Sequence, residues 1–207
     1  RLQPGKMGEG GVFPLDKEWA KTAAEAARKA GAIVICDEVQ TGIGRCGTLF
    51  VYEQYDIQPD LVSLAKGLGS GIPVGAFMAS EKCKDVLSKG DHGTTFGGNP
   101  LSCAVAKTVL SIVSDPSFLQ DVKKKGEYFM EQIQKIDSKI IKEVRGKGLM
   151  IGIVVDENQR MSLINQLLKD GLLVLSAGKD VIRLLPPLII TYEQINEAIE
   201  KMKGVFL

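Results

Sequence analysis

The stretch "AIVICDEVQTG" (residues 32–42) decides the fold class. Five apolar residues rich in β-branched side chains run without alternation and then end abruptly in two acids, Asp37 and Glu38. Such a run predicts a strand buried on both faces, which is typical of parallel sheets. Ligands of open α/β sheets bind at the carboxyl ends of the strands, so Asp37 stands where a ligand would meet it.

Apolar runs and helical patterns alternate through the N-terminal part of the chain. Runs at 61–65 and 74–80 each follow a turn signal, and we expect them to form further buried strands. Helical spacing covers 16–30 and 99–114, and each segment starts at a residue that favours the N-cap. Helices separated by short buried strands predict an α/β domain.

The Asp115-Pro116 pair ends the second of these helices and marks the expected domain boundary. The domains are then 1–115 and 116–207, and the second is predicted to be a smaller α+β domain. Its expected elements are a helix to about 136, two strands within 140–155, a helix near 159–170, strands at 172–176 and 181–186, and a helix at 192–205.

Composition excludes several classes of protein. The 207 residues include 26 Lys and Arg against 25 Asp and Glu, which argues against a nucleic-acid or anionic-membrane surface. No apolar stretch approaches the roughly 18 residues of a membrane span, and no secretory signal pattern is visible. Four irregularly spaced cysteines and one histidine argue against a zinc site. We therefore expect reduced thiols, several of them buried, in a cytoplasmic protein without a bound metal.

A carboxylate at the end of a buried strand has more than one interpretation. Asp37 could hold a proton or a cationic ring nitrogen through a charge-assisted hydrogen bond. Four apolar residues followed by Asp-Glu also imitate the magnesium-binding strand of nucleotide triphosphatases. That alternative needs a Gly-x4-Gly-Lys-Ser/Thr loop, which the chain lacks, but such a loop could lie upstream, so the alternative stays open. The non-functional alternative is an acid that leaves the sheet into solvent.

Two glycine-rich motifs follow. Lys66 ends the apolar run of "LVSLAKGLGSGIPVG" (61–75), and a lysine amine becomes a nucleophile when its surroundings favour the neutral form. In "GDHGTTFGGNP" (90–100), Thr94 and Thr95 lie in a loop before a helix start, where hydroxyl and N–H groups can bind phosphate. Solvated turn residues are the non-functional alternative for both motifs.

These three features together point to pyridoxal phosphate. This cofactor needs a lysine for its aldehyde, an acid for its pyridine nitrogen and a cup for its phosphate. Lys66, Asp37 and the threonine loop supply these groups. Once a substrate displaces its amine, Lys66 would move a proton between two carbons, first as general base and then as general acid.

Five motifs extend the pattern over most of the chain. They are "DEVQTGIGRCG" (37–47), "LAKGLGSGIPVGA" (64–76), "HGTTFGGNPLSCAVA" (92–106), "VRGKGLMIG" (144–152) and "VIRLLPPLIIT" (181–191). In order and spacing they resemble successive motifs of the class III aminotransferases, from about Gly8 to the C-terminus. The resemblance implies the type I fold of pyridoxal phosphate enzymes. It also implies part of the cofactor-binding large domain in 1–115 and a homodimer with active sites at the subunit interface.

The resemblance implies a role for each cofactor-binding residue. Lys66 matches the lysine that binds the cofactor aldehyde, and Asp37 matches the acid on the pyridine nitrogen. Gln40 matches the residue near the phenolic oxygen. Thr95 matches the hydroxyl that reaches the phosphate of the neighbouring subunit's cofactor, and Thr94 matches the adjacent substrate-contacting position.

Two further residues match positions that recognise the substrate. Arg183 matches the arginine that takes the α-carboxylate of glutamate or 2-oxoglutarate by a bidentate pair. Glu9, in "GEGGV" (8–12), matches an acid that covers this arginine when a substrate has no carboxylate there. Considered without the resemblance, Arg183 inside an apolar run could equally form a structural ion pair.

The sequence departs from the family pattern before "GEGGV". Pro4 and Met7 stand in place of the usual Glu-x-x-Gln, so residues 1–7 are interpreted as a foreign or tag-derived start. The upstream half of the family, with its glycine-rich phosphate loop, ring-stacking aromatic and second substrate arginine, has no counterpart here. We therefore expect an incomplete portion of the enzyme, with an exposed sheet edge and an uncovered core face.

Within the family, the motifs look most like those of the enzymes that act on acetylornithine in arginine biosynthesis. The expected reaction transfers the δ-amino group of N-acetylornithine to 2-oxoglutarate, giving N-acetylglutamate 5-semialdehyde and glutamate. Ornithine and 4-aminobutyrate are alternative amino donors. A non-catalytic truncated homologue that acts as a subunit or binding module is the alternative from another class.

Overall fold

The computed structural model describes residues 9–207, which divide into two compact units. In the described part of the chain, the first unit contains 15–44 and 48–119, and the second contains 9–14, 45–47 and 120–207. The division falls between residues 119 and 120. It therefore lies inside the helix Pro116–Gln134, which runs across it without a break. The residues interpreted above as a foreign start, 1–7, lie outside the described residues.

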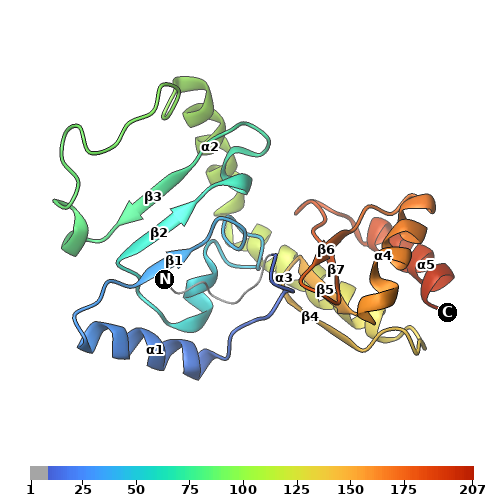
Figure 1. The fold of residues 1–207 in the computed structure, drawn as a ribbon. Helices are drawn as coiled ribbons and strands as arrows, with labels where there is room; N and C mark the ends of the chain where they lie inside the picture. The colour runs from blue at the N-terminus through green and yellow to red at the C-terminus, as the bar shows by residue number, and fades with distance from the viewer. Residues whose placement is uncertain (1–8) are drawn as a thin grey trace. The chain divides into compact units, whose positions relative to one another are not determined.

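The first unit is built on a three-stranded sheet (Figure 1). Its strands β1 (Ile35–Asp37), β2 (Leu61–Leu64) and β3 (Ala76–Ala79) follow one another in that order across the sheet. β1 and β2 are parallel, whereas β2 and β3 are antiparallel. Its helices are α1 (Lys17–Lys29), α2 (Pro100–Val113) and short 3-10 helices at Val51–Tyr55, Lys66–Gly69 and Glu81–Cys83.

Both α-helices of this unit begin where their capping residues predict. The Asp16 carboxylate accepts a hydrogen bond from the Trp19 backbone N–H at 2.8 Å, which satisfies one of the unpaired donors of the first turn of α1. The Asn99 side chain does the same for the Ser102 N–H at 3.0 Å, at the start of α2. The helix predictions for 16–30 and 99–114 are therefore confirmed.

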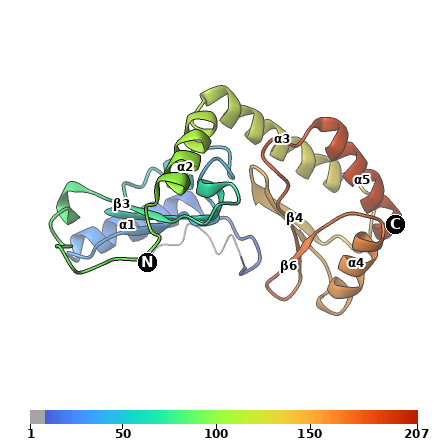
Figure 2. The same cartoon turned by 90° about the horizontal axis from the view of Figure 1, so that it is seen from above.

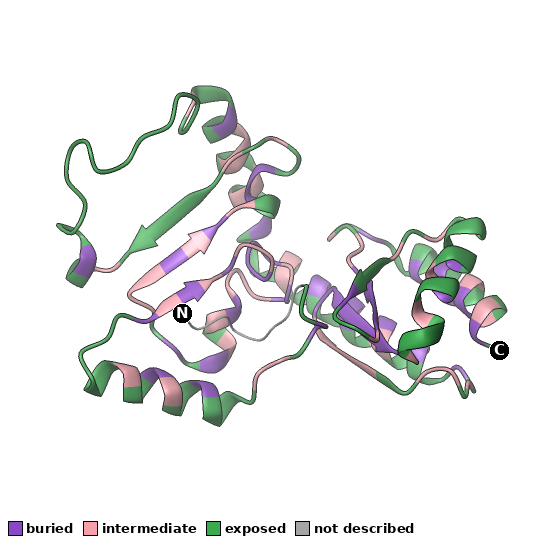
Figure 3. Ribbon diagram, in the orientation of Figure 1, coloured by how far each residue is buried: buried purple, intermediate pink, exposed green. Residues whose placement is uncertain are grey.

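Two predictions about strand burial were wrong (Figure 3). β1 was expected to be buried on both faces, but Cys36 is buried while Ile35 and Asp37 are half-buried. β3 was also expected to be buried, yet all four of its residues are exposed. Apolar composition shows only that a residue tolerates burial, whereas burial itself needs a covering layer, which β3 does not have among the described residues.

The second unit is a four-stranded antiparallel sheet with helices. Its strands are β4 (Glu143–Lys147), β5 (Met150–Val154), β6 (Leu175–Ala177) and β7 (Val181–Leu184), in the order β4-β5-β7-β6. Its helices are α3 (Pro116–Gln134), whose first turn belongs to the first unit, α4 (Glu157–Lys169) and α5 (Tyr192–Phe206). The helices gather on one side of the sheet (Figure 2), and the elements follow the predicted order.

Segment 9–14 packs on this sheet although it comes from the other end of the chain. All five residues of β5 are buried. At Gly152 of β5, an added Cβ would lie 2.9 Å from the Cβ of Val12, so the segment approaches the strand too closely for any side chain there. Gly11 and Val12 of this segment are buried and therefore belong to the core of the second unit.

Arg45 ties segment 45–47 to the same unit. Its guanidinium donates to the carbonyl oxygens of Leu149 at 3.1 Å and of Pro186 at 2.5 Å. Burial lowers the pKa of the Arg45 guanidinium below its ordinary value.

The cysteines match the expectation of buried thiols. Cys36, Cys46 and Cys83 are buried, and Cys103 is exposed. Burial and the nearby Glu38 raise the pKa of the Cys36 thiol to about 12, so this thiol is inert at neutral pH. Over residues 9–207, no helix combines the length and the apolar character that crossing a membrane requires.

Candidate active site

Asp37 occupies the carboxyl end of β1, beside the parallel strand β2. It is in register with Ser63, whose hydroxyl donates to Asp37 Oδ1 at 3.1 Å. The backbone N–H of Val39 donates to the same oxygen at 3.2 Å. These two donors fix the orientation of a half-buried carboxylate at the edge of the sheet where α/β proteins bind ligands.

Lys66 follows the carboxyl end of β2 and has an unusual backbone conformation. Its φ is 48°, in the left-handed region, which costs a residue other than glycine about 1–2 kcal/mol. The turn is held by the buried Leu68, whose N–H donates to the carbonyl of Ala65 at 3.1 Å. Strained backbone of this kind gathers at functional sites, and the Lys66 side chain is exposed.

The topology places these two residues at one edge. The carboxyl ends of parallel strands lie at the same edge of a sheet, and β1 and β2 are parallel neighbours. Asp37 is the last residue of β1, and Lys66 begins the turn that follows β2. The pair predicted from two separate motifs therefore shares one ligand-binding edge.

Gln40 lies in the turn that follows β1. Its side-chain oxygen Oε1 is buried and has no hydrogen-bond partner. The turn itself is organised by Glu38, whose carboxylate accepts from the Thr41 hydroxyl at 2.5 Å and from the Tyr52 N–H at 2.9 Å. A buried polar atom without a partner is uncommon in folded proteins, so the Gln40 amide is a candidate for contact with a ligand.

Thr94 and Thr95 lie in the loop that leads from the 3-10 helix Glu81–Cys83 to α2. Both are exposed. The loop is closed at its end by Asn99, whose side chain caps α2 and also donates to the Phe96 carbonyl at 2.9 Å. Contact of these threonines with a phosphate or a substrate stays a prediction.

Arg183 and Glu9 form an ion pair in the second unit. Arg183 lies on β7 with only 6% of its side chain exposed, whereas the Glu9 side chain is 75% exposed. The two terminal nitrogens of Arg183 both donate to Glu9 Oε1, each at 3.1 Å. Arg183 Nε is buried without a partner, so this arginine has hydrogen-bonding capacity to spare.

The predicted site residues thus form two groups. Asp37, Gln40 and Lys66 follow the strands of the first unit at one edge, and Arg183 and Glu9 pair in the second unit. Sequence reasoning missed two residues that support the first group: Ser63 donates to Asp37, and Glu38 organises the turn on which Gln40 lies. Ser63 was detectable as the lone polar residue in the run "LVSLA", but pairing it with Asp37 required the strand register.

The sequence model of the family "Aminotransferase class-III" matches residues 3–206. The chain belongs to the class-III aminotransferases. Its membership confirms the predicted α/β fold class and the family resemblance, and it removes the nucleotide triphosphatase alternative for Asp37.

Individual sequence relatives and similar solved structures are also named as aminotransferases or transaminases. The acetylornithine aminotransferase of Bacillus cereus is 50% identical over 201 residues, which are 96% of this chain and 52% of the relative. A succinylornithine transaminase of Yersinia pseudotuberculosis is 41% identical over 95% of this chain and 49% of its own length. The ornithine aminotransferase structure from Plasmodium yoelii matches with a TM-score of 0.92 and 32% identity, over 99% of this chain and 55% of that one. The chain thus spans about half the length of these relatives.

The residues at the first site fit the cofactor of the family. Class-III aminotransferases use pyridoxal phosphate. A carboxylate at the strand end, an exposed lysine amine beyond the neighbouring strand and a buried amide oxygen without a partner suit its ring nitrogen, its aldehyde and its ring oxygen. Among residues 9–207, no group of three or more His, Cys, Asp and Glu side chains could hold a metal ion.

Proposed function

We propose that the complete enzyme transfers the δ-amino group of N-acetylornithine to 2-oxoglutarate, as part of arginine biosynthesis. The products are N-acetylglutamate 5-semialdehyde and glutamate. The relative with 50% identity carries the name of this activity, which supports the choice of amino donor.

The ion pair between Arg183 and Glu9 is the observation that carries the proposal. A transaminase of this kind binds two different substrates in turn at one site. Glutamate and 2-oxoglutarate present a carboxylate, which Arg183 binds; N-acetylornithine presents none at that position, and Glu9 then neutralises the arginine. An uncompensated buried guanidinium would be costly, so an acid at this place lets one site accept both substrates.

In this proposal, each residue of the first site has one task. Bound pyridoxal phosphate supplies the electron sink that makes the substrate carbon acidic. Asp37 holds a proton at the ring nitrogen, and Gln40 contacts the ring oxygen. Lys66 Nζ takes a proton from one carbon and returns it to another, as general base and then general acid.

The remaining parts of the proposal concern assembly and location. The enzyme acts as a homodimer with shared active sites, in which Thr95 reaches the phosphate of the neighbouring subunit's cofactor and Thr94 contacts substrate. Exposure of both threonines on the single chain supports this. We place the enzyme in the cytoplasm, which suits a reaction on small amino acids and 2-oxo acids and the three buried thiols.

Relatives of the chain support a second candidate donor. Ornithine is named by a structural relative, and succinylornithine by a sequence relative. These substrates and 4-aminobutyrate share a terminal amino group at the end of a short chain. They differ at the far end of the molecule, where the upstream half of the enzyme would make contact.

Steady-state transamination by the complete enzyme tests the proposal. The rate with 2-oxoglutarate is measured for N-acetylornithine, succinylornithine, ornithine and 4-aminobutyrate as amino donors. We expect kcat/KM to be highest for N-acetylornithine. We expect Lys66→Ala to lose at least about a hundredfold in kcat, because it removes the general base. A control variant at the exposed Lys89, Lys89→Ala, should keep full activity.

The possible outcomes separate the alternatives. Preference for ornithine or 4-aminobutyrate would replace the donor but keep the reaction class. No transamination by the complete enzyme with any donor would favour the non-catalytic homologue. Unchanged activity in Lys66→Ala would refute the assignment of the lysine.

A further inference from the structure

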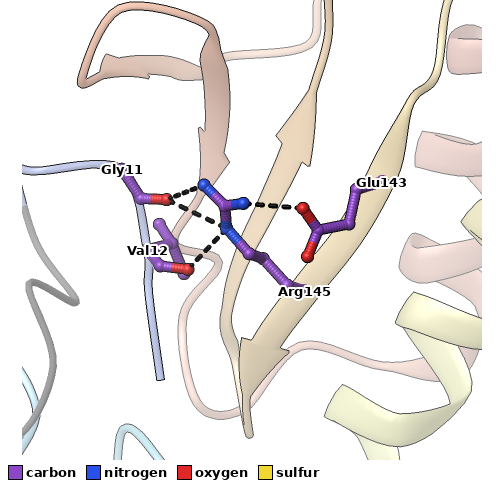
Figure 4. Close-up of polar contacts among 4 residues, drawn as sticks. All are labelled: Gly11, Val12, Glu143 and Arg145. Carbon is purple, nitrogen blue, oxygen red and sulfur yellow. Dashed lines mark hydrogen bonds and ion pairs between the residues drawn. The ribbon is translucent and has the colours of Figure 1, made fainter. Parts of the chain in front are cut away.

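Arg145 on β4 clamps the segment that carries Glu9 (Figure 4). Its Nε donates to the carbonyl oxygens of Val12 at 3.0 Å and Gly11 at 3.3 Å, and a terminal nitrogen donates to Gly11 at 2.9 Å. The other terminal nitrogen pairs with Glu143 at 2.7 Å. Only 13% of the Arg145 side chain is exposed, so these bonds are largely shielded from water.

The neighbouring ring strengthens the clamp. The Arg145 guanidinium lies 3.6 Å from the centre of the Phe13 ring, within the range of a cation–π contact. Three consecutive residues, Gly11, Val12 and Phe13, therefore contact one side chain. The planar fork of arginine provides these donors in a fixed geometry that lysine cannot reproduce.

The segment is also held on the side of Glu9. The N–H of Gly178, in the turn between β6 and β7, donates to the Glu9 carbonyl at 2.7 Å. The backbone is thus fixed at Glu9 by the turn between β6 and β7, and at Gly11 and Val12 by Arg145. Val12 has a φ of 54°, so the clamp holds the segment in a conformation that a valine does not favour.

This arrangement sets the position of the Glu9 carboxylate. Glu9 is mostly exposed and pairs with the buried Arg183 through a single oxygen. Without the hydrogen bonds that fix the backbone at Glu9, Gly11 and Val12, an exposed glutamate would lose more side-chain and backbone entropy to form this pair. Backbone that is already fixed next to Glu9 lowers this entropic cost.

We propose that Arg145 is a positioning residue that determines substrate selectivity: it holds residues 11–13 on β4 and so keeps Glu9 over Arg183. The proposal rests on the proposed function of that pair. Release of the clamp favours ligands whose carboxylate displaces Glu9, and it disfavours amino donors that need Glu9 to neutralise Arg183.

Equilibrium binding of glutarate to the complete holoenzyme tests this proposal. Glutarate is a dicarboxylate without an amino group, so it binds but does not react. In Arg145→Met, which keeps an unbranched side chain of similar length and removes every donor, we expect glutarate to bind about fivefold tighter or more. In the same variant, KM for N-acetylornithine should rise while kcat with glutamate as donor stays within about twofold.

A double-mutant cycle shows whether the effect passes through Glu9. Glu9→Gln alone should also tighten glutarate binding, because the competing carboxylate is removed. Adding Arg145→Met to Glu9→Gln should then change nothing further. A merely structural role of Arg145 would give the same change in both backgrounds, and that result would overturn the proposal.

Two variants control for folding and for charge. Glu143→Gln removes the ion-pair partner of Arg145 but leaves its bonds to Gly11 and Val12, and it should bind glutarate as the wild type does. Arg145→Lys keeps the charge without the fork, and it should give an intermediate affinity. If Arg145→Met does not fold, wild-type affinity in Arg145→Lys would refute the proposal.

The same experiment distinguishes the proposal from the function on which it rests. Arg183→Gln should abolish the tight binding of glutarate. If binding does not depend on Arg183, the proposed substrate recognition fails and the clamp hypothesis with it. If binding depends on Arg183 but not on Arg145, the clamp hypothesis alone fails.

Discussion

The buried carboxyl group of Glu38 organises the turn on which Gln40 lies. Only 1% of Glu38 is exposed, and its two oxygens accept hydrogen bonds from Thr41 and Tyr52. Burial outweighs these bonds and raises the pKa of Glu38 above its ordinary value of 4.5. In the sequence, Glu38 is noted only as a neighbour of Asp37. In the structure, its protonation affects the stability of the turn that carries Gln40.

The raised pKa predicts the direction of a pH effect on stability. The folded state binds the Glu38 proton more tightly than the unfolded state does. The contribution of Glu38 to the free energy of unfolding is therefore fully present below the ordinary pKa of 4.5 and is lost as pH rises through the folded pKa. Urea unfolding of the chain across this range should show a loss of stability that Glu38→Gln removes.

A matched variant isolates the Glu38 effect. Glu25→Gln changes an exposed glutamate of α1 and should leave the pH dependence as it is in the wild type. Glu38→Gln can accept from the Tyr52 N–H with its amide oxygen while its N–H₂ donates to the Thr41 hydroxyl, so both contacts can be kept without a titratable group. An unchanged pH slope in Glu38→Gln would contradict the prediction.

Among the elements, α5 illustrates how a local pattern and packing agree. Its buried residues recur at helical spacing and pack against the second unit: Ile195, Ala198, Ile199, Met202 and Phe206. Its first turn has a capping box, in which Thr191 Oγ1 accepts from the Gln194 N–H at 3.2 Å and Gln194 Oε1 accepts from the Thr191 N–H at 3.0 Å. Both signals can be read from the sequence.

Loss of this cap should destabilise the protein measurably. Thr191→Ala removes one acceptor from the first turn of α5 and should lower the free energy of unfolding by about 1 kcal/mol. The control is Thr108→Ala in the middle of α2, where the hydroxyl donates back to the Ala104 carbonyl and does not cap the helix. That change should be neutral or slightly stabilising. Equal losses in the two variants would show that the cap is unimportant.

Among residues 9–207, each of the two units has its own core, and every residue of β3 is exposed. The second unit buries every residue of β5 and β7, whereas the first unit leaves β3 exposed on both faces. Phe77 on β3 is 54% exposed, and Phe96 in the following loop is 80% exposed. Apolar residues on an edge strand are a surface for association with other chains.

The 207-residue chain studied alone should therefore self-associate. We expect light scattering after size-exclusion chromatography to show species larger than a monomer. Phe77→Lys combined with Phe96→Lys should shift the chain toward monomer, because charge on an edge strand opposes pairing. Leu173→Lys, at an exposed apolar residue of the second unit, is the control and should not have this effect. A wild-type chain that is monomeric at high concentration would contradict the prediction.

Much of the fold and part of the site could be predicted because they depend on local chemistry. Helix starts at Asp16 and Asn99 follow from capping residues a few positions away from the groups that they satisfy. The shared edge of Asp37 and Lys66 follows from two strand ends, provided that the strands are parallel. The support of Asp37 by Ser63 could not be predicted, since it depends on the register of one strand against another.

The type and order of the elements, the candidate residues for the chemistry and the family resemblance could all be read from the sequence alone. These follow from periodicity, capping and motif spacing, which act over a few residues. Only the tertiary structure decided which apolar strands are covered and that segment 9–14 joins the second unit. Glu9 and Arg183 are 174 positions apart, and Gly11 and Arg145 are 134 apart. Such contacts depend on the packing of distant segments, which no local pattern specifies.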